Sequence, residues 1–354
     1  MATYIVDLRH LNSKTPAGKA VYTKTIVELL LEKNTVIGVG NNNFNSMFET
    51  NKNFTFYSTN NLFHHFKMVI LAFKFKAQIF ATESFITPLI SSLLGIKNII
   101  VVHDLISFKD PTHKFFPKLI EKISLPILTK FKNNYFLFST QNGLKESNLL
   151  FKLRKKNSFV FFPGPKFTKT PNKTKKTLIT FVSTFFERKN HILLLKAFDQ
   201  IKDKTDLNLC LVGRFIEPQI SKINQFIKDN KLEDRVILSD YLSDSELKQI
   251  YKKTAILCNP SKIEGFGLQI IEALHMSIPC IVSEIPVFKE VFKNSCLYFE
   301  VDNAQDLSNQ ILFLSKNSEL KHQLNLNSKA ILKKYSFPRT LVNLNAILKK
   351  INSQ

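Results

Sequence analysis

Short apolar runs alternate with longer segments of helical periodicity along the whole chain. In the first part the runs lie at residues 4–8, 35–39, 54–57, 98–102 and 135–139, and in the second part at 178–182, 207–213, 236–238, 255–258 and 280–282. Repeated strand and helix units of this kind indicate a parallel sheet covered by helices. The run at 98–102 has the almost continuous apolar character of a strand buried on both faces. The sequence therefore predicts an α/β protein built from Rossmann-like units.

The pattern divides into two halves. The chain has 354 residues, enough for two α/β domains that each have their own core. Residues 167–176 are rich in Lys, Thr and Pro and lack an apolar period, which is typical of a linker. A proline-containing break at 335–338 precedes a last helical segment. We predict an N-terminal domain at 1–165, a linker at 166–177, a C-terminal domain at 178–335 and a terminal helix at 336–354.

A candidate binding site lies within residues 255–291. Gly265 and Gly267 stand between a predicted strand and a predicted helix. Glycine lets the backbone approach a ligand closely, and the free N–H groups of a helix start favour an anion such as phosphate. Glu264 and Glu272 flank this position, and carboxylates accept hydrogen bonds from sugar hydroxyls. The pattern favours a nucleotide sugar, although such glycines recur in many α/β proteins and Glu272 has an alternative as a solvated helix residue.

Two adjacent cations, Arg188 and Lys189, occupy another predicted strand-to-helix loop. A planar guanidinium fork and a point charge together suit a diphosphate, and plain solvated charge is the alternative. In the first half, Gly18 follows the first strand, and His103 follows the run at 98–102. Ligands of open α/β sheets bind beyond the carboxyl ends of the strands, so His103 is placed for chemistry. An ordinary turn at Gly18 and a structural role for His103 are the alternatives.

The site segment resembles a known family. Glu264-Gly265-Phe266-Gly267-Leu268, followed by Glu272-Ala273 and Ile278-Pro279-Cys280, is similar to the Glu-x7-Glu signature of family 4 glycosyltransferases, which are retaining enzymes of the GT-B fold. Arg188-Lys189-Asn190 resembles their phosphate loop, and His103-Asp104 their acceptor-side motif. Gln269 stands where Pro is common, and Ser277 and Ser183 stand where Gly is usual.

The resemblance implies two Rossmann-like domains whose parallel sheets face a central cleft, with the last helix crossing back to the first domain. It implies transfer of a hexose from a nucleotide diphosphate sugar to a glycan or lipid-linked acceptor, in cell-surface polysaccharide or lipopolysaccharide assembly. The Arg-Lys-Asn version of the phosphate loop favours a mannosyl donor such as GDP-mannose.

Residue roles follow from the same resemblance. It implies that His103 and Glu264 are catalytic, with Glu264 on the donor-sugar hydroxyls, and that Gly18 belongs to a loop facing the acceptor and the diphosphate. The implied donor-binding residues are Arg188, Lys189, Gly265, Phe266, Gly267, Leu268 and Glu272. There is no Asp-x-Asp motif, so we expect neither a metal nor another cofactor beside the co-substrate.

The charge adds a possible partner. The formal net charge is +22, and residues 110–176 contain fifteen Lys and Arg against three Asp and Glu. Such a field attracts an anionic membrane surface, whereas Lys-rich composition alone is the alternative and no nucleic-acid motif is present. Residues 112–132 are the better candidate for a membrane-facing amphipathic helix. For residues 62–76 we slightly favour a Rossmann helix with one side in water.

The remaining features indicate a cytoplasmic protein, peripheral at the inner face of the cytoplasmic membrane. No apolar run reaches the length of a membrane span, and the first ten residues predict a strand rather than a signal peptide. The four cysteines show no Cys-x-x-Cys spacing, which fits a reducing compartment. Two alternatives to a transferase stay open: a sugar-nucleotide epimerase or phosphorylase of the same fold, and a non-catalytic basic binding protein with a degenerate transferase fold.

Overall fold

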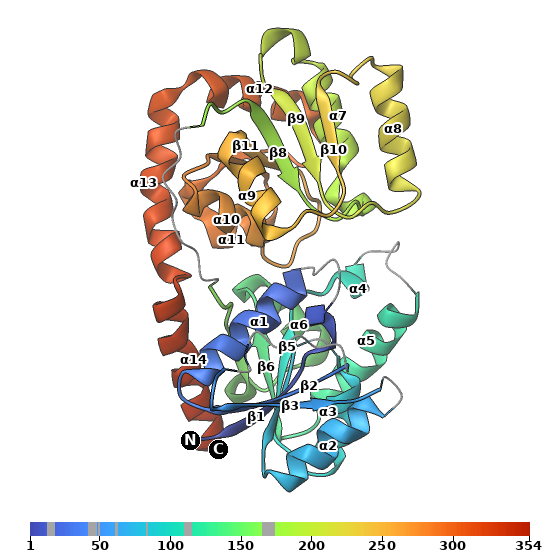
Figure 1. The fold of residues 1–354 in the computed structure, drawn as a ribbon, viewed down its shortest axis with the longest axis vertical. Helices are drawn as coiled ribbons and strands as arrows, with labels where there is room; N and C mark the ends of the chain where they lie inside the picture. Colours follow the sequence, from blue (N-terminus) through green and yellow to red (C-terminus); the bar gives the residue numbers. More distant parts are fainter. Residues whose placement is uncertain are drawn as a thin grey trace. The chain divides into compact units, whose positions relative to one another are not determined.

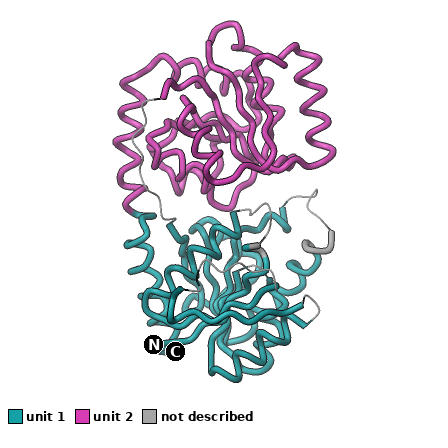
Figure 2. The backbone as a smooth tube through the Cα atoms, viewed as in Figure 1, with its two compact units in different colours: residues 1–166, 334–354 teal, residues 167–333 magenta. Residues whose placement is uncertain are grey.

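The computed structural model describes residues 1–12, 18–41, 48, 50–60, 63–82, 84–109, 115–164 and 174–354. The chain forms two compact units, coloured separately in Figure 2. Unit 1 contains Met1–Lys166 and Lys334–Gln354, and unit 2 contains Phe167–Lys333. The predicted linker lies outside the described residues up to residue 173.

Unit 1 is built on a seven-stranded parallel sheet with the order β3-β2-β1-β4-β5-β6-β7 (Figure 1). The strands are β1 (Thr3–Asp7), β2 (Thr35–Gly40), β3 (Phe54–Ser58), β4 (Gln78–Ala81), β5 (Asn98–Val102), β6 (Asn134–Phe138) and β7 (Ser158–Val160). Its central strands are apolar and buried on both faces, as expected of a parallel sheet covered by helices.

Helices cover both faces of this sheet. They are α1 (Gly18–Leu31), α2 (His64–Lys74), α3 (Ile86–Leu93), α4 (Ile106–Lys109), α5 (Phe115–Leu128), α6 (Gln141–Phe151) and α14 (Phe337–Asn352), with 3-10 turns η1 (Arg9–Asn12) and η2 (Lys155–Asn157). Ile26 of α1 and Leu344 of α14 share a buried cluster with Tyr4 and Val6. Met68 of α2 packs instead in a cluster with the alternate strand residue Ile5. The terminal helix α14 is therefore part of the core of unit 1.

Unit 2 has a six-stranded parallel sheet with the order β10-β9-β8-β11-β12-β13. Its strands are β8 (Leu178–Val182), β9 (Asn208–Val212), β10 (Val236–Ser239), β11 (Thr254–Asn259), β12 (Cys280–Ser283) and β13 (Leu297–Phe299). Its helices are η3 (Glu187–Lys189), α7 (His191–Asp199), η4 (Lys202–Lys204), α8 (Gln219–Asp229), α9 (Asp244–Lys253), α10 (Leu268–His275), α11 (Pro286–Phe292), η5 (Lys293–Ser295), α12 (Ala304–Lys316) and α13 (Ser318–Lys334).

The parallel topology gathers the loops that carry the candidate residues. In each sheet all carboxyl ends lie at one edge, where ligands of such folds bind. In unit 2, β8 and β11 are neighbouring strands. The loop that holds Arg188 and Lys189 and the loop that holds Glu264 therefore begin side by side, although they are 75 residues apart in the sequence.

A glycine beyond β9 allows a close backbone contact at the same edge. Gly213 has φ +143°, and an added Cβ would lie 2.1 Å from the carbonyl oxygen of Ser183. The Gly213 N–H also donates to the carbonyl of Ser239 at 3.0 Å. Only glycine fits both this backbone conformation and this contact.

We expect Gly213→Ala to destabilise unit 2, by about 2 kcal/mol or more, because it combines a strained φ with a backbone clash. Urea unfolding followed by circular dichroism would measure the loss. Gly18→Ala is the matched control, because a Cβ at Gly18 would meet nothing within 4 Å. Equal midpoints for the two variants would contradict this account of Gly213.

Candidate functional site

The glycine-rich loop of unit 2 ends in a tightly packed helix start. Gly267 precedes α10 and adopts a left-handed conformation with φ +98°. An added Cβ there would lie 2.9 Å from the ring of Phe288 and 3.0 Å from Ile270. Phe266 is buried, and Leu268 is the first residue of the helix. The prediction that Gly265 and Gly267 stand between a strand and a helix is therefore confirmed, and the first N–H groups of the helix lie where the loop ends.

An ion pair joins this loop to the loop after β8. The Lys189 ammonium donates to Glu264 Oε1, and both side chains are almost buried. Ser261 Oγ donates to the same carboxylate oxygen at 3.2 Å, and Gln269 Nε2 donates to it at 3.4 Å. Three donors therefore converge on one oxygen of Glu264. Gln269, which departs from the family pattern, is one of them.

Arg188 connects the same two loops through the backbone. Its Nη1 donates to the carbonyl of Ile263 at 3.1 Å, and its own carbonyl accepts from the N–H of Lys262 at 2.9 Å. Its guanidinium carbon also lies 5.5 Å from the centre of the Phe186 ring. The structure thus brings Arg188, Lys189 and Glu264 together, as the donor-binding prediction requires. Their roles toward a ligand stay predictions.

The charge state of Glu264 follows from these neighbours. Burial raises the pKa of its carboxyl, but the charges of Lys189 and Arg188 and the hydrogen bonds from Lys189 and Ser261 outweigh burial and leave the pKa below its ordinary value. Glu264 is therefore ionised at neutral pH. An ionised carboxylate is an acceptor only, which suits sugar hydroxyls.

Glu272, on α10, lies in a different electrostatic environment. The Tyr251 hydroxyl donates to its Oε2 at 2.8 Å. Burial raises the pKa of Glu272 to about 7, because the hydrogen bond from Tyr251 only partly offsets burial and Asp244 adds repulsion. The two glutamates of the signature therefore differ in charge near neutral pH. Spacing in the sequence gave no sign of this difference, because Tyr251 is 21 residues from its partner.

In unit 1, His103 lies directly after β5. Its Nε2 is 2.7 Å from the carbonyl oxygen of Thr82, so this nitrogen carries the proton. Burial and the nearby charge of Lys19 lower its pKa to about 4, against the opposing effects of Thr82 and Asp104. The Tyr22 ring contacts the imidazole edge-on with centroids 4.6 Å apart. At neutral pH His103 is uncharged, and its Nδ1 is a hydrogen-bond acceptor.

Gly18 is the first residue of α1 and is exposed. Most of the loop before it, residues 13–17, lies outside the described residues. Because a Cβ there would meet open space, packing within the described residues does not require glycine. Its predicted role beside an acceptor or diphosphate stays a prediction.

A polar network at the carboxyl end of β1 was not predicted from the sequence. Asp7 Oδ2 accepts from Arg9 Nη2 at 2.7 Å and lies 3.1 Å from Nε2 of the fully buried His64. His65, next in α2, has its Nδ1 2.7 Å from Thr87 Oγ1. Burial raises the pKa of Asp7, but His64 and Arg9 lower it much further. The one sequence signal for this network was Asp7, a carboxylate at the end of the first buried strand.

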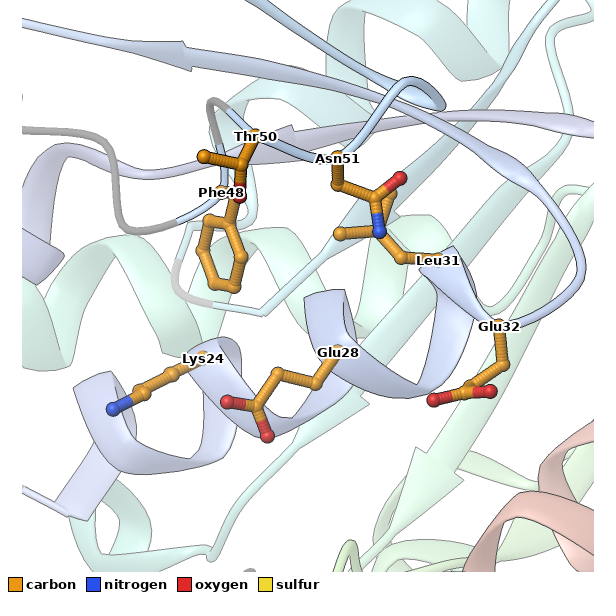
Figure 3. Close-up of a pocket in the computed structure, with 7 residues that line it drawn as sticks. All are labelled: Lys24, Glu28, Leu31, Glu32, Phe48, Thr50 and Asn51. Atoms are coloured by element: carbon orange, nitrogen blue, oxygen red, sulfur yellow. The ribbon is translucent and has the colours of Figure 1, made fainter.

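A pocket of about 440 Å³ lies elsewhere in unit 1 (Figure 3). Its lining includes Lys24 and Glu28 of α1, Glu32 directly after α1, and Phe48. It contains none of the predicted site residues, and its two carboxylates outnumber its single lysine. It is therefore a poor place for a diphosphate.

Among the described residues, no group of three or more His, Cys, Asp or Glu side chains could hold a metal ion. Within the same part of the chain, no helix combines the length and the apolar character needed to cross a membrane.

Comparisons with known proteins bear on this site. Residues 165–331 match the family described as Glycosyl transferases group 1. The O-antigen biosynthesis glycosyltransferase WclY of Escherichia coli is 27% identical over 213 residues, covering 57% of this chain and 53% of WclY. The O-antigen chain mannosyltransferase RfbU of Salmonella typhimurium is 40% identical over 89 residues, 25% of each chain. The chain thus spans about half the length of WclY and a quarter of RfbU.

Solved structures resemble the whole chain. HepE of Anabaena in complex with UDP has a TM-score of 0.78 at 14% identity, covering 99% of this chain and 100% of HepE. WaaG, a glycosyltransferase involved in lipopolysaccharide biosynthesis, has a TM-score of 0.71 at 10% identity, covering 96% and 98%. At such identities the likeness shows the fold, and it confirms the predicted GT-B fold of two Rossmann-like domains.

The two glutamates predict opposite pH dependences of stability. The pKa of Glu272 in the folded chain is about 7, above its ordinary value of 4.5. The protonated carboxyl therefore stabilises the fold fully below pH 4.5, and this stabilisation is lost as the pH rises to 7. We expect Glu272→Gln to remove this loss. Between pH 4.5 and 7, the free energy of unfolding of the Glu272→Gln variant relative to wild type should then rise by on the order of 1–3 kcal/mol.

Glu264→Gln provides the contrast. The pKa of Glu264 is lowered, so its contribution is present above its ordinary pKa of 4.5 and is lost as the pH falls below that value. Urea unfolding across both windows measures the two differences. A Glu272→Gln difference that does not change between pH 4.5 and 7 would contradict the raised pKa.

Proposed function

We propose that this chain, whose residues 165–331 carry a group 1 glycosyl transferase domain, is a retaining glycosyltransferase. It would move a hexose from a nucleotide diphosphate sugar to a glycan or lipid-linked acceptor in the assembly of cell-surface polysaccharide or lipopolysaccharide. The names of WclY, RfbU and WaaG support this biosynthetic setting. The observation that carries the proposal is the convergence of Arg188, Lys189 and Glu264 beside the start of α10.

The reaction explains why these groups would be needed together. The bond between the anomeric carbon and the diphosphate oxygen breaks, a bond to the acceptor oxygen forms, and the proton of the acceptor hydroxyl passes to the leaving diphosphate. Negative charge develops on the leaving diphosphate, where Arg188, Lys189 and the N–H groups at the start of α10 would stabilise it. Cations and backbone N–H groups can supply this stabilisation themselves, so we propose no metal or other cofactor.

The glutamates and the histidine would position the donor and the reacting sugar. Ionised Glu264 accepts hydrogen bonds from donor-sugar hydroxyls, and Glu272 accepts from the ribose. Because the pKa of Glu272 is about 7, ribose binding would weaken as the pH falls and this carboxyl takes up a proton. Neutral His103 in unit 1 would accept a hydrogen bond at Nδ1 from a hydroxyl of the reacting sugar or the acceptor.

Two finer assignments are also proposals. The names of RfbU and of the serotype-specific mannosyltransferase WbdA support mannose as the sugar, and hence GDP-mannose as the donor. HepE was crystallised with UDP-glucose, which makes a UDP-sugar the second candidate. We further propose that the protein works in the cytoplasm, peripherally at the inner face of the membrane. The anionic membrane surface, rather than nucleic acid, would then be the partner of the positive charge of this protein.

Nucleotide binding gives the first test. We expect either GDP or UDP to raise the melting temperature, since a ligand that binds only the folded state stabilises it by mass action. Arg188→Ala should weaken that binding about ten- to hundredfold, the value of a lost hydrogen bond to a charged group. Differential scanning calorimetry measures the first effect, and isothermal titration calorimetry measures the second. Lys196→Ala, at an exposed lysine of α7, is the matched control and should bind like wild type.

Lys189 needs a paired substitution, because removing it alone would leave buried Glu264 without its counter-charge. Lys189→Met combined with Glu264→Gln removes both charges and should retain the fold while losing nucleotide-sugar binding. If the wild-type protein binds no nucleoside diphosphate, the transferase proposal is overturned. Binding to a nucleotide sugar without transfer to any acceptor would favour the degenerate binding protein.

A further inference from the structure

Helix α2 of unit 1 is apolar on two sides. Met68, Val69 and Leu71 face the buried cluster over the sheet. The opposite side carries a second apolar row with the 3, 4, 3 spacing of one helix face, and its members are 55–64% exposed. We call this row the α2 stripe, and it consists of Phe63, Phe66, Ile70 and Phe73. Helix α2 thus packs on the sheet with one side exposed, as favoured from the sequence, but that exposed side is apolar rather than polar.

The helices beside α2 also expose apolar side chains. Helix α2 packs beside α3, and α3 packs beside α5 (Figure 1). Leu93 and Leu94 at the end of α3 are exposed, as are Ile123 and Ile127 of α5. Thirteen of the nineteen large hydrophobic side chains exposed among the described residues belong to α2, α3, α5, α6 or their ends. Soluble proteins expose scattered apolar residues, whereas a concentration of this kind marks an interaction surface.

The charge around the α2 stripe indicates its partner. Lys74 and Lys76 are exposed at the end of α2, with the Lys74 ammonium 5.4 Å from the centre of the Phe75 ring. Exposed Lys122 and Lys130 lie in or just after α5. Residues 50–82 contain no Asp or Glu. A second copy of the chain would bring lysines against lysines, whereas anionic lipid headgroups complement them.

We propose that the α2 stripe, with the exposed residues of α3 and α5, docks this protein on an anionic bilayer surface. Aromatic side chains would enter the boundary between headgroups and acyl chains, and the lysines would contact lipid phosphates. The inference rests on the proposed function, since it names the surface of unit 1 that would meet the membrane partner.

The anchoring of α2 connects this surface to the candidate acceptor side. His64, directly after Phe63, contacts Asp7 at the carboxyl end of β1, and His65 contacts Thr87. The first turn of α2 is therefore fixed at the sheet edge where ligands of such folds bind. An acceptor whose lipid is embedded in the bilayer would present its reactive end near this edge.

Vesicle binding by the full chain tests the proposal. Wild type should sediment with vesicles of mixed phosphatidylcholine and phosphatidylglycerol, and only weakly with phosphatidylcholine alone. We expect Phe66→Ser, Ile70→Ser, Phe73→Ser together to lower vesicle affinity by at least about tenfold, because three apolar side chains lose their burial in the interface. Lys74→Gln with Lys76→Gln should lower it by roughly fivefold for each lysine and reduce its salt dependence.

The matched control is Phe313→Ser with Leu326→Ser, which changes exposed apolar residues of α12 and α13 in unit 2 and should leave vesicle binding unchanged. Melting temperatures of all variants should stay at the wild-type value, since these side chains are exposed. Vesicle binding by the triple variant equal to wild type overturns the proposal. The proposal is also overturned if the wild type forms a dimer and does not bind vesicles, and the triple substitution dissociates that dimer. The surface would then bind a second copy of the chain.

Nucleotide binding, measured on the same samples, separates this proposal from the proposed function. Nucleotide binding without vesicle binding overturns the docking surface alone. Vesicle binding without any nucleotide binding supports the surface and overturns the transferase.

Discussion

The ion pair between Lys189 and Glu264 is the interaction on which the candidate site depends. Both side chains are almost buried, and a buried charge is tolerated only when it is paired and hydrogen-bonded. Neighbouring strands β8 and β11 deliver the two residues to one edge, and the surrounding donors complete the network. The same contact thus closes two loops over the sheet and fixes the ionisation of the carboxylate. The pair that holds the two loops together is therefore also the pair that we propose for donor binding.

Much of the fold could be predicted from apolar periodicity. Buried strands such as β5, and the helix that follows Gly265 and Gly267, are specified by local sequence. The elements β4, α3, α11 and β13, which are four, eight, seven and three residues long, were not predicted from the sequence. An element of three to eight residues offers few positions for a period, so tertiary pairing with its neighbours often decides whether it forms.

The site was predictable as a set of residues and not as a network. Glycines, cations and carboxylates at the ends of predicted strands pointed to the two loops of unit 2. The partners of those groups were not predictable, because Lys189 reaches Glu264 across 75 residues and Tyr251 reaches Glu272 across 21. Only the packed sheet decides that one glutamate is ionised while the other has a pKa near neutrality. The role of Gln269 as a donor likewise depends on a loop conformation that no spacing rule specifies.

The discontinuity of unit 1 has a consequence for biosynthesis. Unit 2 is one continuous segment, whereas the core of unit 1 includes Leu344, Leu348 and Ile351 of α14. During translation the residues of unit 2 emerge from the ribosome before α14 does. Until then, the face of unit 1 formed by α1 and β1 lacks its covering helix, and its apolar side chains remain accessible to chaperones or to aggregation. The nascent chain can therefore complete its second unit before its first.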